Sequence, residues 1–136
     1  MEEFQRADRI ELSKRQGIAS RVSGVLKDAG LPVPTDVELE RGPGAVIEVD
    51  PGEDAAGGVY ITWHVGPELD DRNNRRLLAG ELLHDEIGFA GHVSESMMNA
   101  IVEILSFKRF DVEVSDEEIR PYSIKVHGGP QADDGI

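Results

Sequence analysis

The stretch GVYITWHV, residues 58–65, decides the fold of this chain. Six of its eight residues are β-branched or aromatic, which fit the half-buried surface of a pleated sheet. The segment before it, residues 50–57, contains Pro51 and two glycines and is typical of a loop. The stretch therefore predicts the best strand of the protein.

Two more strands are expected immediately before this one. Residues 37–40 and 45–49 both have short β-type patterns, and the turn sequence RGPG, residues 41–44, separates them. Because short loops join consecutive strands, we expect the three to form an antiparallel meander.

Alternation along these strands assigns their side chains to two faces. One face is predicted to be the core and holds Val37, Leu39, Ala45, Ile47, Val49, Val59, Ile61, Trp63 and Val65. The outer face is acidic, with an aromatic and an aliphatic member, and holds Glu38, Glu40, Val46, Glu48, Tyr60, Thr62 and His64. This pattern is typical of a sheet that helices cover on one side.

Helices are predicted at both ends of the meander. Residues 3–29 lack proline and carry apolar residues at helical spacing, and Gly30, Pro32 and Pro34 mark the end. Residues 68–83 and 94–108 are the next two predicted helices, with a connector at residues 84–91. Residues 110–114 and 122–126 alternate as two final strands.

The predicted fold is α+β: an antiparallel sheet of about five strands with helices packed on one face. The order is α-β-β-β-α-α-β-β. Residues 1–127 are expected to form a single domain, since 136 residues suffice for one ordinary core. The polar residues 128–136 are expected to be a disordered tail.

Charge is the strongest feature of the composition. Twenty-seven acidic residues oppose fourteen basic ones, which gives a formal net charge of −13. Such a surface repels phosphate backbones and anionic membranes and attracts basic partners. The alternative is that the charge only maintains solubility. The chain has no cysteine, no apolar stretch long enough for a membrane span and no signal-peptide pattern, so a cytoplasmic location is expected.

The sequence contains no motif that specifies a reaction. It lacks a nucleophile elbow, a phosphate-binding loop, a zinc-protease helix and a calcium loop. We therefore expect no catalytic residues, no cofactor and no metal. One alternative is a small enzyme or metal protein that uses His64, or His84 together with His92. The spacing of His84 and His92 matches no metal signature, and a solvent-exposed role for His64 is the simpler interpretation.

Two features favour binding to another protein. The helix at 94–108 has a wider apolar face than a single sheet contact requires, and we expect Met97, Ile101 and Ile104 to form a dimer interface. The alternative is a helix buried on most sides. On the outer face of the sheet, the predicted partner-binding residues are Val46, Tyr60, His64, Glu38, Glu40 and Glu48.

The order of elements over residues 10–127, together with the acidity and the absence of cysteine, resembles the small acidic chaperones of type III secretion. The chain differs from them in lacking a clear C-terminal helix and in having an extra helix before residues 94–108. The resemblance implies a dimeric protein that holds an extended segment of a client protein, without catalysis or cofactor. The double-stranded-RNA-binding fold begins in the same order but needs a basic helix end, which this chain lacks.

The leading hypothesis is thus a non-catalytic, chaperone-like accessory protein that holds or stabilises a partner protein, as a homodimer or in a heteromer, and binds neither nucleic acid nor membrane. A second hypothesis is an acidic inhibitor, such as an immunity or anti-defence protein, that blocks a basic cleft with Glu38, Glu40 and Glu48.

Overall fold

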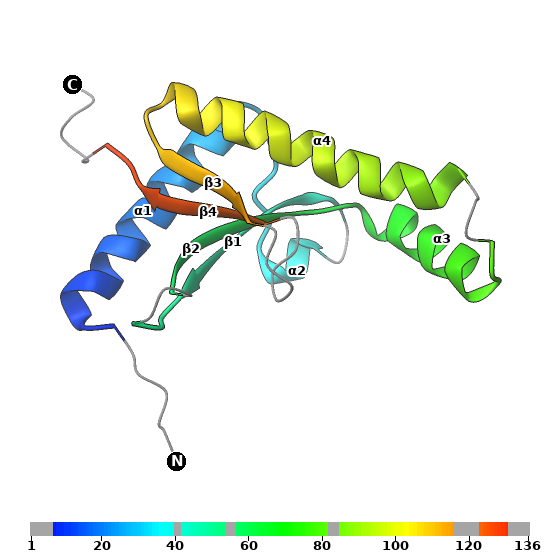
Figure 1. The fold of residues 1–136 in the computed structure, drawn as a ribbon, viewed down its shortest axis with the longest axis horizontal. Helices are drawn as coiled ribbons and strands as arrows, with labels where there is room; N and C mark the ends of the chain where they lie inside the picture. Colours follow the sequence, from blue (N-terminus) through cyan, green and yellow to red (C-terminus); the bar gives the residue numbers. More distant parts are fainter. Residues whose placement is uncertain (1–6, 40–41, 54–56, 82–84, 116–122, 131–136) are drawn as a thin grey trace, which may run out of the picture.

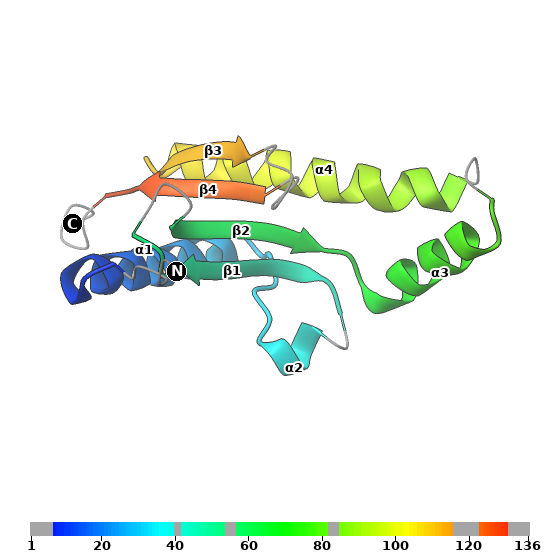
Figure 2. The same cartoon turned by 60° about the horizontal axis from the view of Figure 1, so that its bottom comes forward.

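Four antiparallel strands form one sheet in the order β1-β2-β4-β3 in the computed structural model of the chain (Figures 1 and 2). The structure describes residues 7–39, 42–53, 57–81, 85–115 and 123–130. The strands are β1 (Gly44–Asp50), β2 (Gly58–His64), β3 (Asp111–Ser115) and β4 (Ser123–Gly128). The helices are α1 (Arg9–Asp28), α2 (Asp36–Leu39), α3 (Pro67–Leu78) and α4 (Asp85–Phe107).

Helices α1 and α4 cover one face of the sheet, and α3 lies beyond its end, against α4 (Figure 2). The core fills the space between these two helices and the sheet. It consists of Ile18, Val22, Leu26, Ala45, Val59, Ile61, Trp63, Met98, Ile101, Leu105, Phe110, Ile124 and Val126. The α+β class and the antiparallel sheet are therefore confirmed, with four described strands in place of about five.

Local sequence explains the limits of α1. The carboxylate of Asp8 accepts a hydrogen bond from the backbone nitrogen of Glu11 at 2.8 Å, which caps the first turn. At the other end Gly30 has φ +89°, and the backbone nitrogen of Leu31 donates to the oxygen of Leu26 at 3.0 Å. These are the features of a glycine-terminated helix, as the sequence predicted.

The predicted strand at residues 37–40 is wrong, because this segment begins with the short helix α2. Thr35 and Glu38 form a reciprocal cap: the Thr35 hydroxyl accepts from the Glu38 backbone nitrogen at 3.3 Å, and Glu38 accepts from the Thr35 nitrogen at 3.0 Å. This is a capping box, which fixes a helical start. Val37 is consequently 65 % exposed and does not belong to the core.

Other element boundaries also differ from expectation. Helix α3 ends at Leu78, five residues early, and Gly80 follows with φ +76°. Helix α4 begins at Asp85, so most of the predicted connector is helical and packs against α3. None of the described helices has an apolar run of the length that a membrane crossing requires.

Candidate protein-binding groove

Strand β1 lies at an edge of the sheet, and its backbone has a free side. Its ladder with β2 runs from Gly44↔His64 to Asp50↔Gly58 without interruption. The backbone nitrogen of Ala45 donates to the oxygen of Pro32 at 3.0 Å, which lies outside the ladder. In an antiparallel pair, successive residues turn their N–H and C=O groups to alternate sides. The backbone groups of Ala45, Ile47 and Val49 therefore point away from β2.

The outward groups of Ile47 and Val49 are unpaired. Within the described part of the chain, no hydrogen bond reaches the backbone of either residue from a helix, a loop or another strand. Unpaired edge groups form a template for the addition of another strand.

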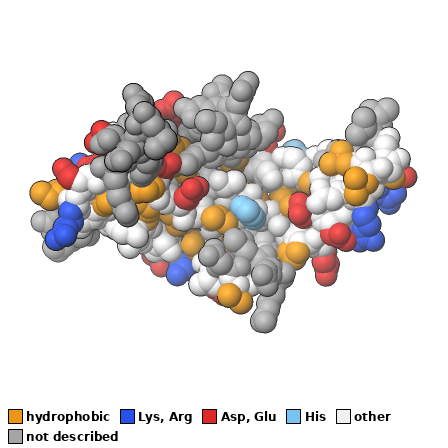
Figure 3. Space-filling model, turned by 90° about the horizontal axis from the view of Figure 1, so that it is seen from below, with side chains coloured by type: hydrophobic (Ala, Val, Ile, Leu, Met, Phe, Trp, Pro, Cys, Tyr) orange, Lys and Arg blue, Asp and Glu red, His pale blue; other side chains and the backbone are white. Residues whose placement is uncertain are grey.

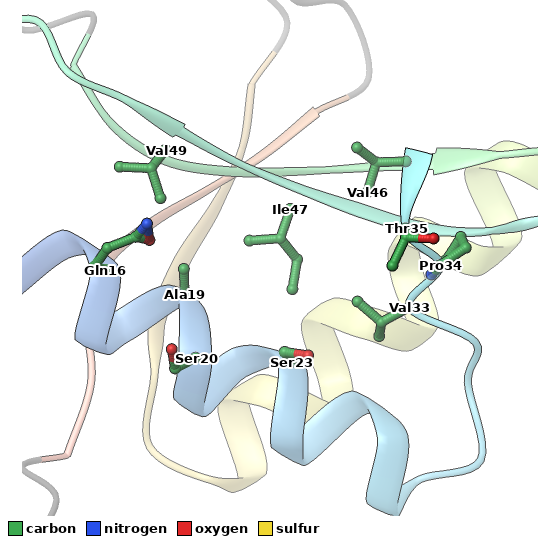
Figure 4. Close-up of a pocket in the computed structure, with 10 residues that line it drawn as sticks. All are labelled: Gln16, Ala19, Ser20, Ser23, Val33, Pro34, Thr35, Val46, Ile47 and Val49. Carbon is green, nitrogen blue, oxygen red and sulfur yellow. The ribbon is translucent and has the colours of Figure 1, made fainter. Parts of the chain in front are cut away.

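A groove of about 790 Å³ runs beside this edge (Figure 4). Helix α1 forms one wall with small and polar side chains, the segment 33–35 closes one end, and β1 forms the other wall. Ile47 projects from β1 toward α1 in this view. The lining residues are Gln16, Ala19, Ser20, Ser23, Val33, Pro34, Thr35, Val46, Ile47 and Val49.

The sequence of α1 explains why there is space. Its buried stripe consists of Arg15, Ile18, Val22 and Leu26, which face the core at helical spacing. The adjacent stripe contains Ala19, Ser20 and Ser23, whose short side chains cannot fill the space next to β1. The groove therefore follows from the residue types on one flank of α1.

None of the ten lining residues is charged, although 30 % of the chain is. Depletion of charge is a mark of the central part of protein interfaces. Acidic side chains follow lining residues closely in the sequence, since Glu48 is exposed on β1 and Glu38 is exposed on α2, three residues after Thr35. Hydrogen bonds from the backbone and side chain of Thr35 lower the pKa of Glu38, with a smaller contribution from Lys27. Glu38 therefore stays ionised at neutral pH.

The other edge of the sheet is protected against strand addition. Strand β3 has five residues, a register shift between Asp111 and Val112, and the acidic residues Asp111 and Glu113. Short, bulged and charged edges are common defences against unwanted pairing. Strand β1 is longer and regular, so it is the more open of the two edges.

The predicted partner-binding residues are only partly brought together. Val46 lines the groove and Glu48 is next to it on β1. Glu38 is exposed, but on α2 and not on the sheet, and Glu40 lies outside the described residues. His64 is exposed at the end of β2, where it lines a separate hollow of about 420 Å³ with Asp70 of α3, Ser94 of α4 and other residues.

Tyr60 is on the expected face but is not a surface residue. It is 3 % exposed, on the central strand β2 between β1 and β4. The ammonium nitrogen of Lys125 lies 5.6 Å from its ring centroid, a cation–π geometry. Tyr60 therefore has too little exposed area to contact a partner. Around the sheet, the surface carries scattered acidic and hydrophobic side chains, with basic ones at the α3 end and also at the opposite end (Figure 3).

The predicted dimer residues divide in a similar way. Ile101 is fully buried in the core of the single chain and offers no area to a second subunit. Met97 and Ile104 are half-buried and pack at the margin of the core. The interface on α4 stays a prediction for these two residues.

The alternative of a metal site at His84 and His92 gains no geometric support, whereas the alternative that uses His64, which lines the hollow with Asp70 and Ser94, stays a hypothesis. His92 is exposed on α4, and His84 lies outside the described residues. Among the residues that the structure places, no three His, Asp or Glu side chains are grouped as metal ligands would be.

Sequence reasoning missed most of the groove. It assigned Ile47 and Val49 to the core face, and both do pack against the core, but it did not predict that they also line a groove at the edge of the sheet. A signal was present in the short residues Ala19, Ser20 and Ser23, which repeat at helical spacing beside the apolar stripe of α1. Comparisons of the chain with models of protein families, with curated proteins and with solved structures find no match.

Proposed function

We propose that this protein binds an extended segment of another protein, which pairs with the free edge of β1 and fills the groove against α1. The observation that carries the proposal is the pair of outward-facing, unpartnered backbone sites at Ile47 and Val49 beside an uncharged groove. The protein acts as a non-catalytic holder of its partner. This role agrees with the one that the resemblance to type III secretion chaperones implies.

Backbone pairing supplies the affinity. An added strand donates to and accepts from the outward groups of Ile47 and Val49, which is how strand addition works in other recognition modules. The edge bond of Ala45 is already taken by Pro32, so the segment 32–34 limits the guest at that end. The guest therefore pairs along the half of β1 that contains Ile47 and Val49.

The groove wall restricts the side chains of the guest. Alternate side chains of an added strand turn toward opposite faces. Those on the helix side meet Gln16, Ala19 and Ser23, where small or medium apolar residues fit. Those on the other side emerge near Glu48, which is exposed.

Charge determines which partner is favoured. A chain of net charge −13 attracts basic segments and repels acidic ones over roughly a Debye length of about 8 Å at physiological salt. The preferred guest is thus uncharged where it faces α1 and basic where it faces Glu48. Binding should weaken as salt rises.

A displayed library of random twelve-residue peptides, selected on the immobilised full chain, tests the proposal. Val49→Pro is the diagnostic variant, because it removes the outward N–H of β1 without touching the β1–β2 ladder. Selected peptides should bind the wild type, carry Lys or Arg, and lose at least about tenfold in affinity on Val49→Pro, since each 1.4 kcal/mol is a factor of ten.

The matched control is Val114→Pro, at the other edge of the sheet. Ile124 of β4 turns its backbone N–H and C=O groups toward β2. Its partner Val114 on β3, and likewise Val112 opposite Val126, therefore turn their backbone N–H and C=O groups away from the sheet. Val114→Pro should leave peptide binding unchanged. Peptides that bind Val49→Pro with the same affinity as they bind the wild type would refute the β1 site.

A further inference from the structure

A polar hollow of about 420 Å³ lies where β2, α3 and α4 meet. Figure 2 shows β2 leading into α3, which lies against α4. Thr62 and His64 line the hollow from the end of β2, Asp70 from the first turn of α3, and Ser94 from α4. Its volume is within the roughly 300–1,000 Å³ that small-molecule sites occupy.

The polar side chains of this hollow can accept hydrogen bonds from a ligand. Asp70 supplies a carboxylate, and Thr62 and Ser94 supply hydroxyl oxygens. Within the part of the chain that the structure describes, none of these three side chains has a hydrogen bond or an ion pair. Because the protein does not use these oxygens as acceptors, they are available to a ligand that carries N–H donors.

The charge of the hollow favours a cation. Neither lysine nor arginine is among the described residues that line it, and Asp70 brings a negative charge. Glu68 and Asp70 in the first turn of α3 offset the positive end of that helix, which would otherwise attract an anion. The net charge of −13 adds a general attraction for cations. An anionic ligand is therefore disfavoured.

The rest of the lining is apolar and consists of Trp63, Val65 and Pro67, which fit a short carbon chain. A primary ammonium group has three N–H donors, the same number as the carboxylate and the two hydroxyls together. We infer that this hollow binds a primary alkylammonium ion, with its charged end at Asp70. The inference is independent of the β1 groove, because the two share no lining residue.

Titration of the full chain with butylammonium chloride at constant ionic strength tests the inference. Trp63 is the only tryptophan of the chain and lines the hollow, so its fluorescence and its single indole N–H resonance report binding. The dissociation constant should be on the order of 1 mM, as expected for so small a ligand. Butanol and sodium butyrate are the matched control ligands, and neither should bind at the same concentrations.

Asp70→Asn is the diagnostic variant and should raise the dissociation constant at least about tenfold, because it removes the charged acceptor. Glu68→Gln is the matched control. It removes the same charge from the same exposed turn, at a residue that does not line the hollow, and should bind like the wild type. Circular dichroism checks that Asp70→Asn folds, which the exposure of Asp70 leads us to expect.

Two sources can supply such an ammonium group: a free amine, or the lysine side chain of a partner protein. N-acetyl-lysine methylamide is therefore titrated in parallel. Binding of butylammonium alone assigns the hollow to free amines, and tighter binding of the lysine derivative assigns it to a lysine side chain.

Three outcomes would overturn the inference: neither cation binds, butanol binds equally well, or Asp70→Asn leaves the dissociation constant unchanged. Val49→Pro should not alter butylammonium binding, so failure of the β1 groove and failure of this hollow are distinguishable.

Discussion

The guanidinium of Arg15 donates from Nη1 to the carbonyl oxygen of Gly52 at 2.7 Å, and this bond ties α1 to the loop that follows β1. The same nitrogen donates to the oxygen of Asp50 at 2.7 Å, and Nε lies 3.3 Å from the Glu11 carboxylate. Arg15 is buried. Because α1 and β1 are the two walls of the groove, this side chain helps to hold their spacing.

Replacing Arg15 by Ala should lower the free energy of unfolding by about 3 kcal/mol, because hydrogen bonds from charged donors contribute roughly 1.5–3 kcal/mol each and two carbonyls lose theirs. Urea unfolding measures the change. The stability of Arg15→Lys should lie between those of the wild type and Arg15→Ala, since a single ammonium cannot reproduce the planar guanidinium. A loss below 1 kcal/mol for Arg15→Ala would show that water replaces these bonds at little cost.

Gly57 lies against the same contact. A methyl group on its Cα would overlap the oxygen of Gly52 and lie 2.7 Å from Nη1 of Arg15. Gly57→Ala should therefore destabilise the protein by about 2 kcal/mol, the range typical of overpacking. Thermal unfolding measures this loss of stability.

Gly24→Ala is the control for this substitution. Gly24 is inside α1, and its added methyl would meet no atom within 4 Å. Alanine is the better helix former, so this variant should gain about 0.5–1 kcal/mol. Equal effects of the two substitutions would contradict the close approach at Gly57.

The C-terminal end of α1, the central strand β2 and the antiparallel sheet could be predicted from sequence because local signals and burial agree there. Gly30 and the alternating residues 58–65 each point to one outcome, whereas the predicted start of the helix at residue 3 was wrong, since α1 begins at Arg9 after the Asp8 cap. The strand predicted at residues 37–40 was wrong because alternation over four residues is a weak signal. The capping pair of Thr35 and Glu38 is a stronger local one.

The site was less predictable than the fold. Parity placed Tyr60 correctly on a face, but it cannot tell the centre of a sheet from its edge, and exposure depends on that. Strand order requires knowledge of which distant strand pairs with which. The position of β4 between β2 and β3 is such a non-local choice, and it is what leaves β1 at the edge.

Acid should weaken the cap of α2. The pKa of Glu38 in the folded protein lies below its ordinary value because the Thr35 backbone and hydroxyl bond to the carboxylate. A lowered folded pKa means that this contribution to stability is present above the unfolded pKa and is lost as the pH falls through the folded one. Thr35→Ala should raise the Glu38 pKa, measured by carboxyl carbon NMR. Val37→Ala, at an exposed position of the same turn, should leave the Glu38 pKa unchanged.

Arg109, which follows the end of α4, has a backbone conformation that is unfavourable for arginine. Arg109 has φ +69°, in the left-handed region that glycine adopts at little cost. Phe110 donates to the oxygen of Leu105 at 3.0 Å across this turn, as in a glycine-terminated helix. Arg109→Gly should therefore raise the free energy of unfolding by about 1 kcal/mol. Arg109→Ala keeps the strained backbone and serves as control, so stabilisation by both variants would indicate a charge effect instead.

Amide hydrogen exchange tests the open edge of β1 directly in the free protein. The amides of Val46 and Glu48 bond to β2, whereas those of Ile47 and Val49 face the groove. Protection of the first pair should exceed that of the second by about a hundredfold or more, because unpaired amides need no opening event before they exchange. If all four are equally protected at high protein concentration and the protection of Ile47 and Val49 falls on dilution, a second copy pairs along β1. If their protection persists on dilution, the chain itself already covers this edge, and the groove would not be open to a partner.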